Sequence, residues 1–208
     1  MALTIVGCGP GSPDCLTPEA RQAVQAADVL VGARRLLEMF PTAGRERIPV
    51  GSDIPWVLER IAERLPAPVA VLVSGDPGFC SLARPVLARF GREGCRVIPA
   101  VSSVQVAFAR IGLDWFDARF VNAHHRIPEL DASTLGEVSK LAILAGRPQA
   151  LAWIADLGRQ LGGDRRIFVC EDLTLPEERV REVRLAQLAD LETSSRTVVL
   201  VVGRECLP

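Results

Sequence analysis

Apolar residues in the first half of the chain form short unbroken runs, separated by stretches in which they recur at helical spacing. The run Val69–Val73 is typical of a strand buried on both faces of a parallel sheet. Further strands are expected at Leu3–Gly7, at Val29–Val31 and up to Ile98. Amphipathic spacing predicts helices over 54–65, 83–90 and 104–111. Strands therefore alternate with helices through residue 113, which predicts a parallel sheet centred on Val69–Val73.

Residues that cap helices precede three of the predicted helices. Thr17 followed by Pro18 is a typical helix start, with threonine as N-cap and proline at the first helical position. Ser52 or Asp53 caps the helix over 54–65. Ser102 with Gln105 fits a capping box. These signals predict where the helices begin.

The second half of the chain predicts a second α/β domain. Gly112–Asp117 is interpreted as the boundary, so that the two domains cover residues 1–114 and 118–208. A helix is expected at Pro148–Leu161 and a short helical piece at Leu185–Leu191. Strands are expected near Phe120–Asn122, Leu141–Leu144, Arg166–Cys170, Val180–Val183 and Thr197–Val202. Because the last strands follow one another with little helix between them, the second sheet is predicted to be mixed.

Composition and charge narrow the function classes. The 208 residues are 49% hydrophobic and 24% charged, as in an ordinary globular protein, and the net charge of −1 gives no reason to expect nucleic acid or an acidic membrane surface as a partner. No apolar run approaches the roughly 20 residues that a membrane span needs. The start of the chain is neither basic nor strongly apolar, so we expect a cytoplasmic protein.

The six cysteines do not predict a metal site. They form no C-x-x-C pair and have no histidine at zinc-finger spacing, so reduced thiols are expected and a metal is not. Cys8 and Cys80 lie in glycine-rich loops, where both are interpreted as small packing side chains and not as nucleophiles.

Three loops follow predicted strands, at the edge of the sheet where α/β proteins bind ligands. They cover Gly7–Pro13, Ser74–Phe79 and Pro99–Gln105. The first contains three glycines but does not fit a dinucleotide fingerprint, because the helix begins only near Pro18 and no acid ends the second strand. Nicotinamide or flavin binding is therefore disfavoured. Asp76, in the second loop, is either a ligand contact or a turn carboxylate that accepts hydrogen bonds from its own loop.

These loops, together with Ala123–Arg126 and the segments Glu171–Leu173 and Pro176–Arg179, resemble the tetrapyrrole methylase family over nearly the whole chain. Within the family, the chain is most similar to the stand-alone members that methylate C5 of a precorrin, with cobalt-precorrin-7 or its metal-free counterpart as substrate. The resemblance implies two α/β domains with a cleft for S-adenosylmethionine (SAM) between them, and S-adenosylhomocysteine as product. It departs from the family at Ala100 and His125, where glycine is more common.

The resemblance also implies roles for individual residues. Cofactor contacts are expected at Pro10, Gly75, Asp76, Phe79, Ser102, Ser103, Leu144, Ala145, Glu171 and Leu173. Arginines are suited to the carboxylates of a corrinoid. Substrate contacts are expected at Arg126, Arg34, Arg35 and His125, with Arg119 a further candidate. His124 is the candidate proton acceptor, and the two adjacent histidines would point to opposite sides if the segment is extended.

Several alternatives stay open. A methylase of the same fold could act on another precorrin carbon, on diphthamide or on ribosomal RNA, and a non-catalytic protein could hold a tetrapyrrole or a nucleoside. The resemblance further implies a homodimer. Larger relatives join this domain to one that methylates C15 and removes a carboxyl group. After Thr197–Val202 only six residues remain, so we expect a separate protein to supply that activity.

Overall fold

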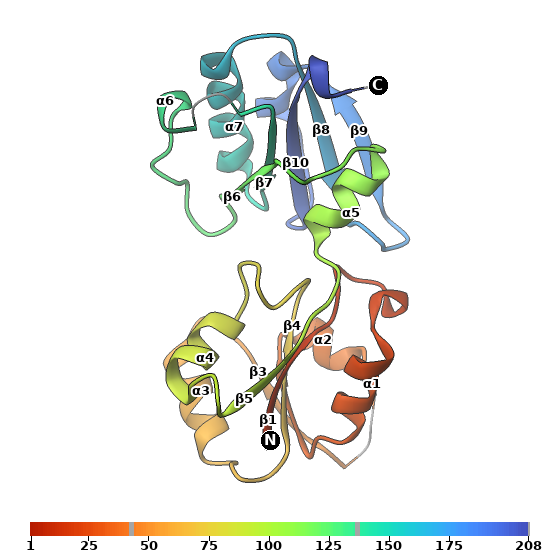
Figure 1. Cartoon of the computed structure of the whole chain (residues 1–208), viewed down its shortest axis with the longest axis vertical. Coiled ribbons are helices and arrows are strands. Elements are labelled where there is room, and N and C mark those ends of the chain that lie inside the picture. Colours follow the sequence, from red (N-terminus) through yellow and green to blue (C-terminus); the bar gives the residue numbers. More distant parts are fainter. Residues whose placement is uncertain (42–43, 136–137, 208) are drawn as a thin grey trace. The chain divides into compact units, whose positions relative to one another are not determined.

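The computed structural model describes residues 1–41, 44–135 and 138–207. The chain divides into two compact units, Met1–Ser102 and Ser103–Pro208 (Figure 1). Each unit contains one five-stranded sheet with helices, in agreement with the predicted α/β class. The two units are described separately below.

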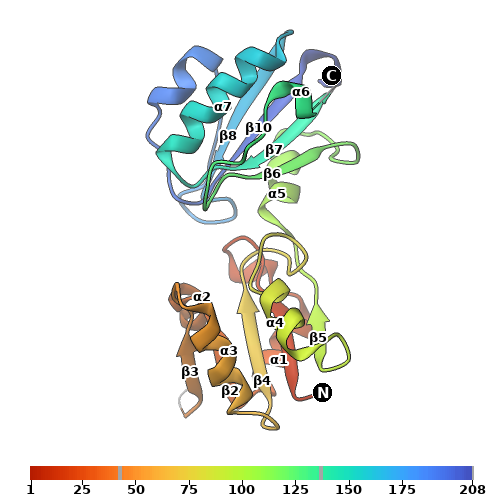
Figure 2. The ribbon, with the colours of Figure 1, turned by 90° about the vertical axis from the view of Figure 1, so that its left-hand side faces the viewer.

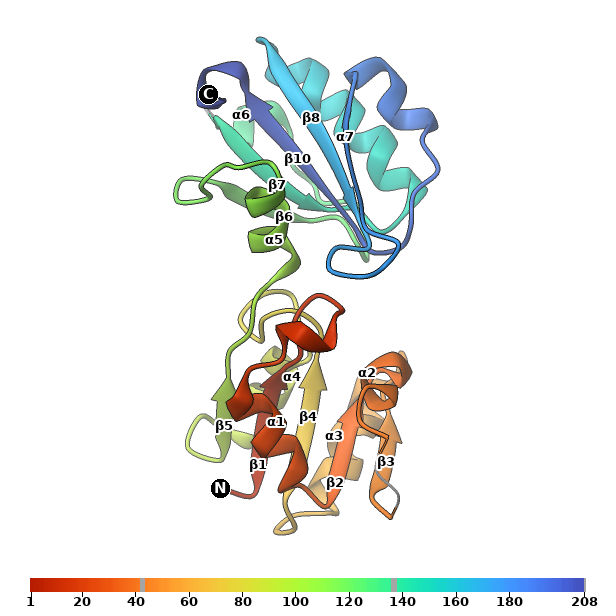
Figure 3. The same cartoon turned by 90° about the vertical axis from the view of Figure 1, so that its right-hand side faces the viewer.

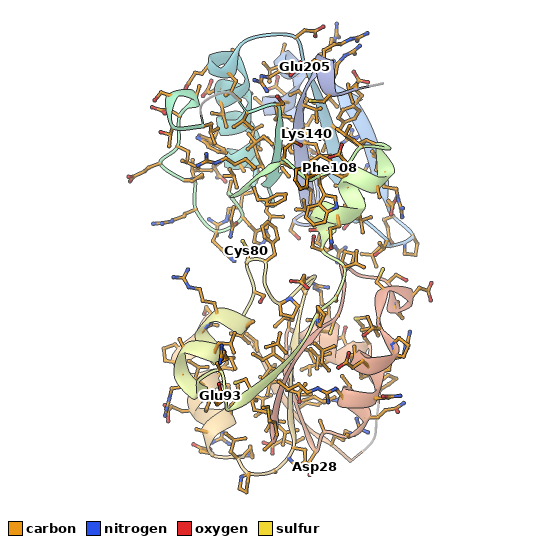
Figure 4. The ribbon with its side chains drawn as sticks, in the orientation of Figure 1. Asp28, Cys80, Glu93, Phe108, Lys140 and Glu205 are labelled. Carbon is orange, nitrogen blue, oxygen red and sulfur yellow. The ribbon has the colours of Figure 1, made fainter. Side chains whose placement is uncertain are left out.

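The boundary between the units lies earlier in the chain than the predicted one at 114–118. Helix α5 (Ser103–Arg110) packs against β10 (Thr197–Gly203), a strand of the second sheet. The segment after α5 is held by Lys140, whose buried Nζ lies 2.9 Å from Asp114 Oδ1 and 2.6 Å from Asp117 Oδ1. Figure 4 labels Lys140 in the second unit. These contacts assign α5 and the residues that follow it to the second unit.

The first unit is built on an all-parallel sheet in the order β3-β2-β4-β1-β5. Its strands are β1 (Leu3–Gly7), β2 (Val29–Gly32), β3 (Glu46–Pro49), β4 (Val69–Val73) and β5 (Cys95–Ile98). All five residues of β4 are buried. The prediction that this strand is central is therefore confirmed.

Helices cover both faces of the first sheet, which explains why its strands are apolar without alternation. The helices are α1 (Pro18–Gln25), α2 (Arg34–Glu38), α3 (Ile54–Ala62) and α4 (Ala83–Phe90), with a 3₁₀ turn at Pro13–Cys15. α3 and α4 pack on one face, around Val71, and α1 and α2 pack on the other, around Leu72 (Figure 2). The expected caps are present. Thr17 Oγ1 accepts the Ala20 amide at 3.1 Å, and an Asp53 oxygen accepts the Trp56 amide at 3.0 Å.

Besides the 3₁₀ turn at Pro13–Cys15, two elements of the first unit were not predicted. In β3 only Ile48 is buried, because the strand lies at the edge of the sheet, so it leaves no apolar run in the sequence. α2 spans five residues and has no capping side chain, which is too little pattern to identify a helix.

The second unit has a mixed sheet in the order β6-β7-β10-β8-β9, as predicted. Its strands are β6 (Arg119–Asn122), β7 (Lys140–Leu144), β8 (Arg165–Glu171), β9 (Arg179–Val183) and β10. β6 runs parallel to β7, and the other neighbours are antiparallel. All seven residues of the central strand β10 are buried.

Helix α7 spans Pro148–Leu161 as predicted and packs on one face of the second sheet, while α5 lies on the other (Figure 3). The expected helical piece near Leu185 is a 3₁₀ helix over Leu185–Asp190 that packs against α7. A four-residue helix α6 (Ala132–Leu135) and a 3₁₀ turn at Arg204–Cys206 were not predicted. Within the described ranges, no helix combines the length and apolar character that a membrane crossing requires.

Candidate functional site

The loops after β1 and β4 are joined through their backbones. The Cys8 amide donates to the Val73 carbonyl at 2.9 Å, and the Gly75 amide donates to the Gly9 carbonyl at 2.8 Å. Gly9 and Gly75 have φ values of +72° and +64°, in the left-handed region that favours glycine. This pairing brings Pro10, the residue after Gly9, beside the loop of Gly75. Two of the predicted cofactor positions thus lie together.

Asp76 ties the loop after β4 to the loop after β5. Its Oδ1 accepts the Gly78 amide at 2.8 Å, and its Oδ2 accepts the Ala100 amide at 3.0 Å. In the structure, Asp76 is therefore a turn carboxylate that also joins two loops. Its contact with a ligand stays a prediction.

The remaining predicted positions of the first unit lie around the same loops. A Cβ built on Gly75 would lie 3.8 Å from Ser102 Cα, so the positions of Gly75 and Ser102 line one space. Ser102 is 9% exposed, and Ser103 is the first residue of α5. Phe79 is half-buried, and its amide donates to the Asp76 carbonyl at 3.1 Å.

Gly7 shows how closely these loops pack. A Cβ on Gly7 would lie 2.7 Å from the Ala100 Cβ, 2.9 Å from Pro77 Cδ and 3.0 Å from the Ala100 amide nitrogen. All three distances are at or below the limit that carbon atoms tolerate. Only a glycine at this position lets the loops after β1, β4 and β5 come together.

Arg35 of α2 reaches these loops, whereas Arg34 is exposed. An Nη atom of Arg35 donates to the Ser74 hydroxyl. Burial raises the pKa of the Cys8 thiol to about 12, although the Arg35 charge lowers it in part. Cys8 is therefore a neutral packing thiol, as predicted. Cys80 (labelled in Figure 4) is exposed, so the interpretation of its side chain as loop packing was wrong. Its φ is +51°.

In the second unit, the two histidines follow β6 in a bend. The Asn122 side-chain oxygen accepts the His124 amide at 2.9 Å, and the rings of His124 and His125 meet edge to face with their centroids 4.8 Å apart. The two side chains were expected to point to opposite sides only if this segment were extended, and the segment is bent instead. The strand ends at Asn122, and the chain turns before the histidines.

His124 is the candidate site residue whose protonation is most altered. Burial lowers its pKa below 6.5, and the positive charges of His125 and Arg147 lower it further. The imidazole is therefore neutral near pH 7 and can accept a proton. His125 and Arg126 are both exposed, and within the described part of the chain Arg126 has no ion-pair partner.

The end of β7 lies beside His124. Leu144 is the last residue of this strand and is half-buried, and the fully buried Ala145 donates its amide to the Thr197 carbonyl at 2.9 Å. Gly146 follows and faces the His124 ring. Sequence reasoning missed Gly146, although a glycine directly after a buried strand signals a close approach.

Glu171 has a structural role in this unit. It is fully buried, and its carboxylate accepts hydrogen bonds from Arg179 at 3.1 Å, from Arg181 at 2.7 Å and from the Ser194 amide at 3.1 Å. These three donors give the Glu171 carboxylate a structural role, and its contact with the cofactor stays a prediction. Leu173 is also buried, with 3% of its surface exposed.

Further ion pairs hold the loop after β8. Asp172 accepts from Arg196 Nε at 2.6 Å, and Glu178 accepts from Arg110 of α5 and from the Thr174 amide. The hydrogen bond from Arg110 is the main reason that the pKa of Glu178 is lowered. Over the described residues, no group of three or more His, Cys, Asp or Glu side chains is arranged to hold a metal ion.

Comparison with known proteins identifies relatives along the whole chain. The chain is 33% identical over 202 residues to the cobalt-precorrin-7 C(5)-methyltransferase of Salmonella typhimurium, covering 95% of this chain and 98% of the relative. It is 31% identical over 185 residues to the decarboxylating precorrin-6Y C(5,15)-methyltransferase of a Sinorhizobium species, covering 86% of this chain but 44% of the relative.

A solved structure shows that the fold is also similar to that of a known methyltransferase. The uroporphyrin-III C-methyltransferase of Thermus thermophilus, complexed with S-adenosylhomocysteine, superposes with a TM-score of 0.78 at 25% identity and covers 97% of each chain. The profile of the Tetrapyrrole (Corrin/Porphyrin) Methylases matches residues 2–189. The chain therefore belongs to the tetrapyrrole methylase family of methyltransferases.

Proposed function

We propose that this protein is a SAM-dependent C-methyltransferase of cobalamin biosynthesis that methylates C5 of cobalt-precorrin-7 or its metal-free counterpart. The observation that carries the proposal is the 33% identity, over nearly the full length of both chains, to a relative named for that reaction. The proposal assigns the C5 methyl group to this chain, because the relative that is covered to 98% of its own length is named for C5 alone.

The residues of the first unit fit a SAM molecule. A side chain at position 75 would fill the space beside Ser102. The left-handed φ of Gly75 favours glycine, which has no Cβ, so this space stays free. Pro10 and Phe79 lie on the same pair of loops. The donor supplies an activated methyl group on sulfur. The protein has to align the methyl group with the acceptor carbon and exclude water, which suits loops held by backbone hydrogen bonds.

The second unit contributes Leu144, Ala145 and Leu173 to the proposed cofactor site and His124 to the reaction. A neutral imidazole is suited to take the proton that C5 loses on methylation. Arg126 and His125, both exposed, are proposed to bind substrate carboxylates. Arg35 and the exposed Arg34 are proposed to do the same from the first unit.

The proposal extends to the assembly and location of the enzyme. We assign it to the cytoplasm, in keeping with six cysteines that are all free. A homodimer is proposed because exposed aromatic residues gather near the edge strand β6. Phe116 is 95% exposed, and the neighbouring rings of Trp115 and Phe120 have centroids 6.4 Å apart. A separate protein is proposed to methylate C15.

SAM binding is the first test of this function. Titration calorimetry should detect SAM and S-adenosylhomocysteine, and SAM at 100 times its dissociation constant should stabilise the fold by about 2.7 kcal/mol. Incubation with SAM and cobalt-precorrin-7 should then raise the mass of the corrinoid by one methyl group. A folded protein that binds a corrinoid but not SAM would be a carrier. Methylation of another precorrin, of diphthamide or of RNA instead would show that the enzyme acts on a different substrate from the one proposed.

Replacing Arg126 with alanine should impair corrinoid use and leave SAM binding unchanged. Loss of a charged hydrogen bond to a carboxylate should raise the KM for the corrinoid about tenfold or more. Arg126→Lys should restore little, because lysine cannot bind a carboxylate bidentately. Arg92→Ala is the matched control, since Arg92 is a highly exposed arginine paired with its neighbour Glu93. Equal losses of SAM and corrinoid affinity in Arg126→Ala would contradict the assignment.

A further inference from the structure

The His124 ring lies directly against Gly146. A Cβ built on Gly146 would come within 2.1 Å of His124 Nδ1 and 2.4 Å of His124 Cε1. It would also come within 2.3 Å of the Ser195 carbonyl oxygen. The ring and this carbonyl therefore occupy the space that a side chain at position 146 would fill.

The backbone fixes the position of both partners. The His124 amide is held by the Asn122 side chain at the end of β6, and the residue before Gly146 is hydrogen-bonded to Thr197 at the start of β10. Since neither segment can move aside without breaking these bonds, the ring can keep its place only if position 146 lacks a Cβ.

The same contact defines which ring nitrogen can accept a proton. Nδ1 and the Ser195 carbonyl oxygen approach the same point beside Gly146. Nδ1 therefore lies on the edge of the ring that packs against Gly146, which leaves Nε2 as the candidate proton acceptor. Nε2 is farther from Gly146 than Nδ1 and Cε1 are.

The surroundings favour the neutral ring. His125 stacks edge to face on it, and Arg147 follows Gly146 immediately, so the electrostatic interaction with these neighbours disfavours a second proton on His124. Gly146 also comes just before α7, whose N-terminal end carries a partial positive charge.

We propose that Gly146 is a positioning residue, which seats the His124 imidazole so that its Nε2 accepts the proton released from C5 of the substrate. This inference rests on the proposed function. As the C5–methyl bond forms, the bond between that methyl carbon and sulfur breaks and its electron pair stays on sulfur. The C5–H electron pair returns to the ring system, and the proton passes to Nε2 and then to solvent.

The chain suits a direct test, because His124 and His125 are its only histidines. In a His125→Gln background the single remaining imidazole can be titrated by NMR. We expect a His124 pKa below 6.5, because burial and Arg147 still act on it. Adding Gly146→Ala should displace the ring and move that pKa toward its ordinary value. Gly51→Ala is the matched control, since a Cβ there meets nothing within 4 Å.

Methylation should respond in parallel. In the parent protein, the rate should fall on acidification only below the lowered pKa of His124. Gly146→Ala should reduce kcat about 100-fold, as expected for a misplaced reacting group, and shift the acid limb to higher pH while SAM binding persists. An unchanged His124 pKa and pH profile in folded Gly146→Ala would overturn the proposal.

His124→Gln keeps the test decisive if the alanine variant fails to fold. Glutamine is polar but cannot take up a proton, so the variant should bind SAM and lose the acid limb together with most of its rate. A His124→Gln enzyme with the parent rate and pH profile would refute the inference and leave the proposed function intact. Absence of methylation by the unaltered protein would instead refute the proposed function.

Discussion

Replacing Gly7 with alanine is expected to destabilise the first unit by about 3 kcal/mol, because the new methyl group would overlap two loops at once. It would lie 2.7 Å from the Ala100 Cβ and 2.9 Å from Pro77 Cδ. Since Gly7 ends β1 and these neighbours lie in the loops after β4 and β5, the strand-end loops would be forced apart. Urea unfolding should measure the loss, and SAM affinity should fall with it.

Ala100 provides the internal check on this explanation. Ala100→Gly removes the nearest clashing atom, so adding it to Gly7→Ala should recover about 1 kcal/mol or more, although the contact with Pro77 remains. Ala100→Gly alone should cost about 1 kcal/mol through the flexibility of the unfolded chain. Gly51→Ala, in open space, should change little. If the effects of Gly7→Ala and Ala100→Gly on the free energy of unfolding were simply additive, the methyl groups at positions 7 and 100 would not be in steric conflict, which would contradict this explanation.

Replacing Glu171 with glutamine is expected to destabilise the second unit by about 3 kcal/mol. The carboxylate is fully buried and accepts from Arg179, Arg181 and the Ser194 amide. An amide would set its own N–H donors against these donors and would leave two arginines without their buried counter-charge. The loop after β8 should open, which hydrogen exchange of its amides would detect.

Glu182→Gln is the matched control on the same pair of strands. Glu182 of β9 pairs with Arg166 of β8, but its side chain is 46% exposed where that of Glu171 is fully buried, so its loss should cost about 1 kcal/mol or less, as is typical of surface ion pairs. The cost of Glu171→Gln should also depend less on salt, since the Glu171 carboxylate is fully buried and is screened less than an exposed one. Similar costs for the two variants would mean that burial of Glu171 adds nothing.

Much of the fold could be predicted, because a strand that is buried on both faces leaves an uninterrupted apolar run in the sequence. β4 and α7 have the predicted bounds, and the caps at Thr17 and Asp53 are present. Short elements at an edge escaped prediction. In β3 a single buried residue is all that the fold requires. The assignment of α5 to the second unit depends on its long-range packing against β10, which no local pattern encodes.

The candidate site was predictable where backbone conformation dictates residue type. Glycines in the strand-end loops were identified, and Gly75 does have a left-handed φ. Side-chain roles were harder to predict, because they depend on partners distant in sequence. The hydrogen bonds that Glu171 accepts from Arg179, Arg181 and Ser194, for example, were not predicted. Gly146 was missed because its constraint is the His124 ring, more than twenty positions earlier in the chain.

The most direct test of the central claim is the position of the methyl group that this chain adds. The purified protein should be incubated with cobalt-precorrin-7 and SAM whose transferable methyl carbon is ¹³C, and the product examined by mass spectrometry and NMR. The account predicts one labelled methyl group, bonded to C5, with every carboxyl group of the substrate retained. A label at another carbon, or two methyl groups with loss of carbon dioxide, would contradict it.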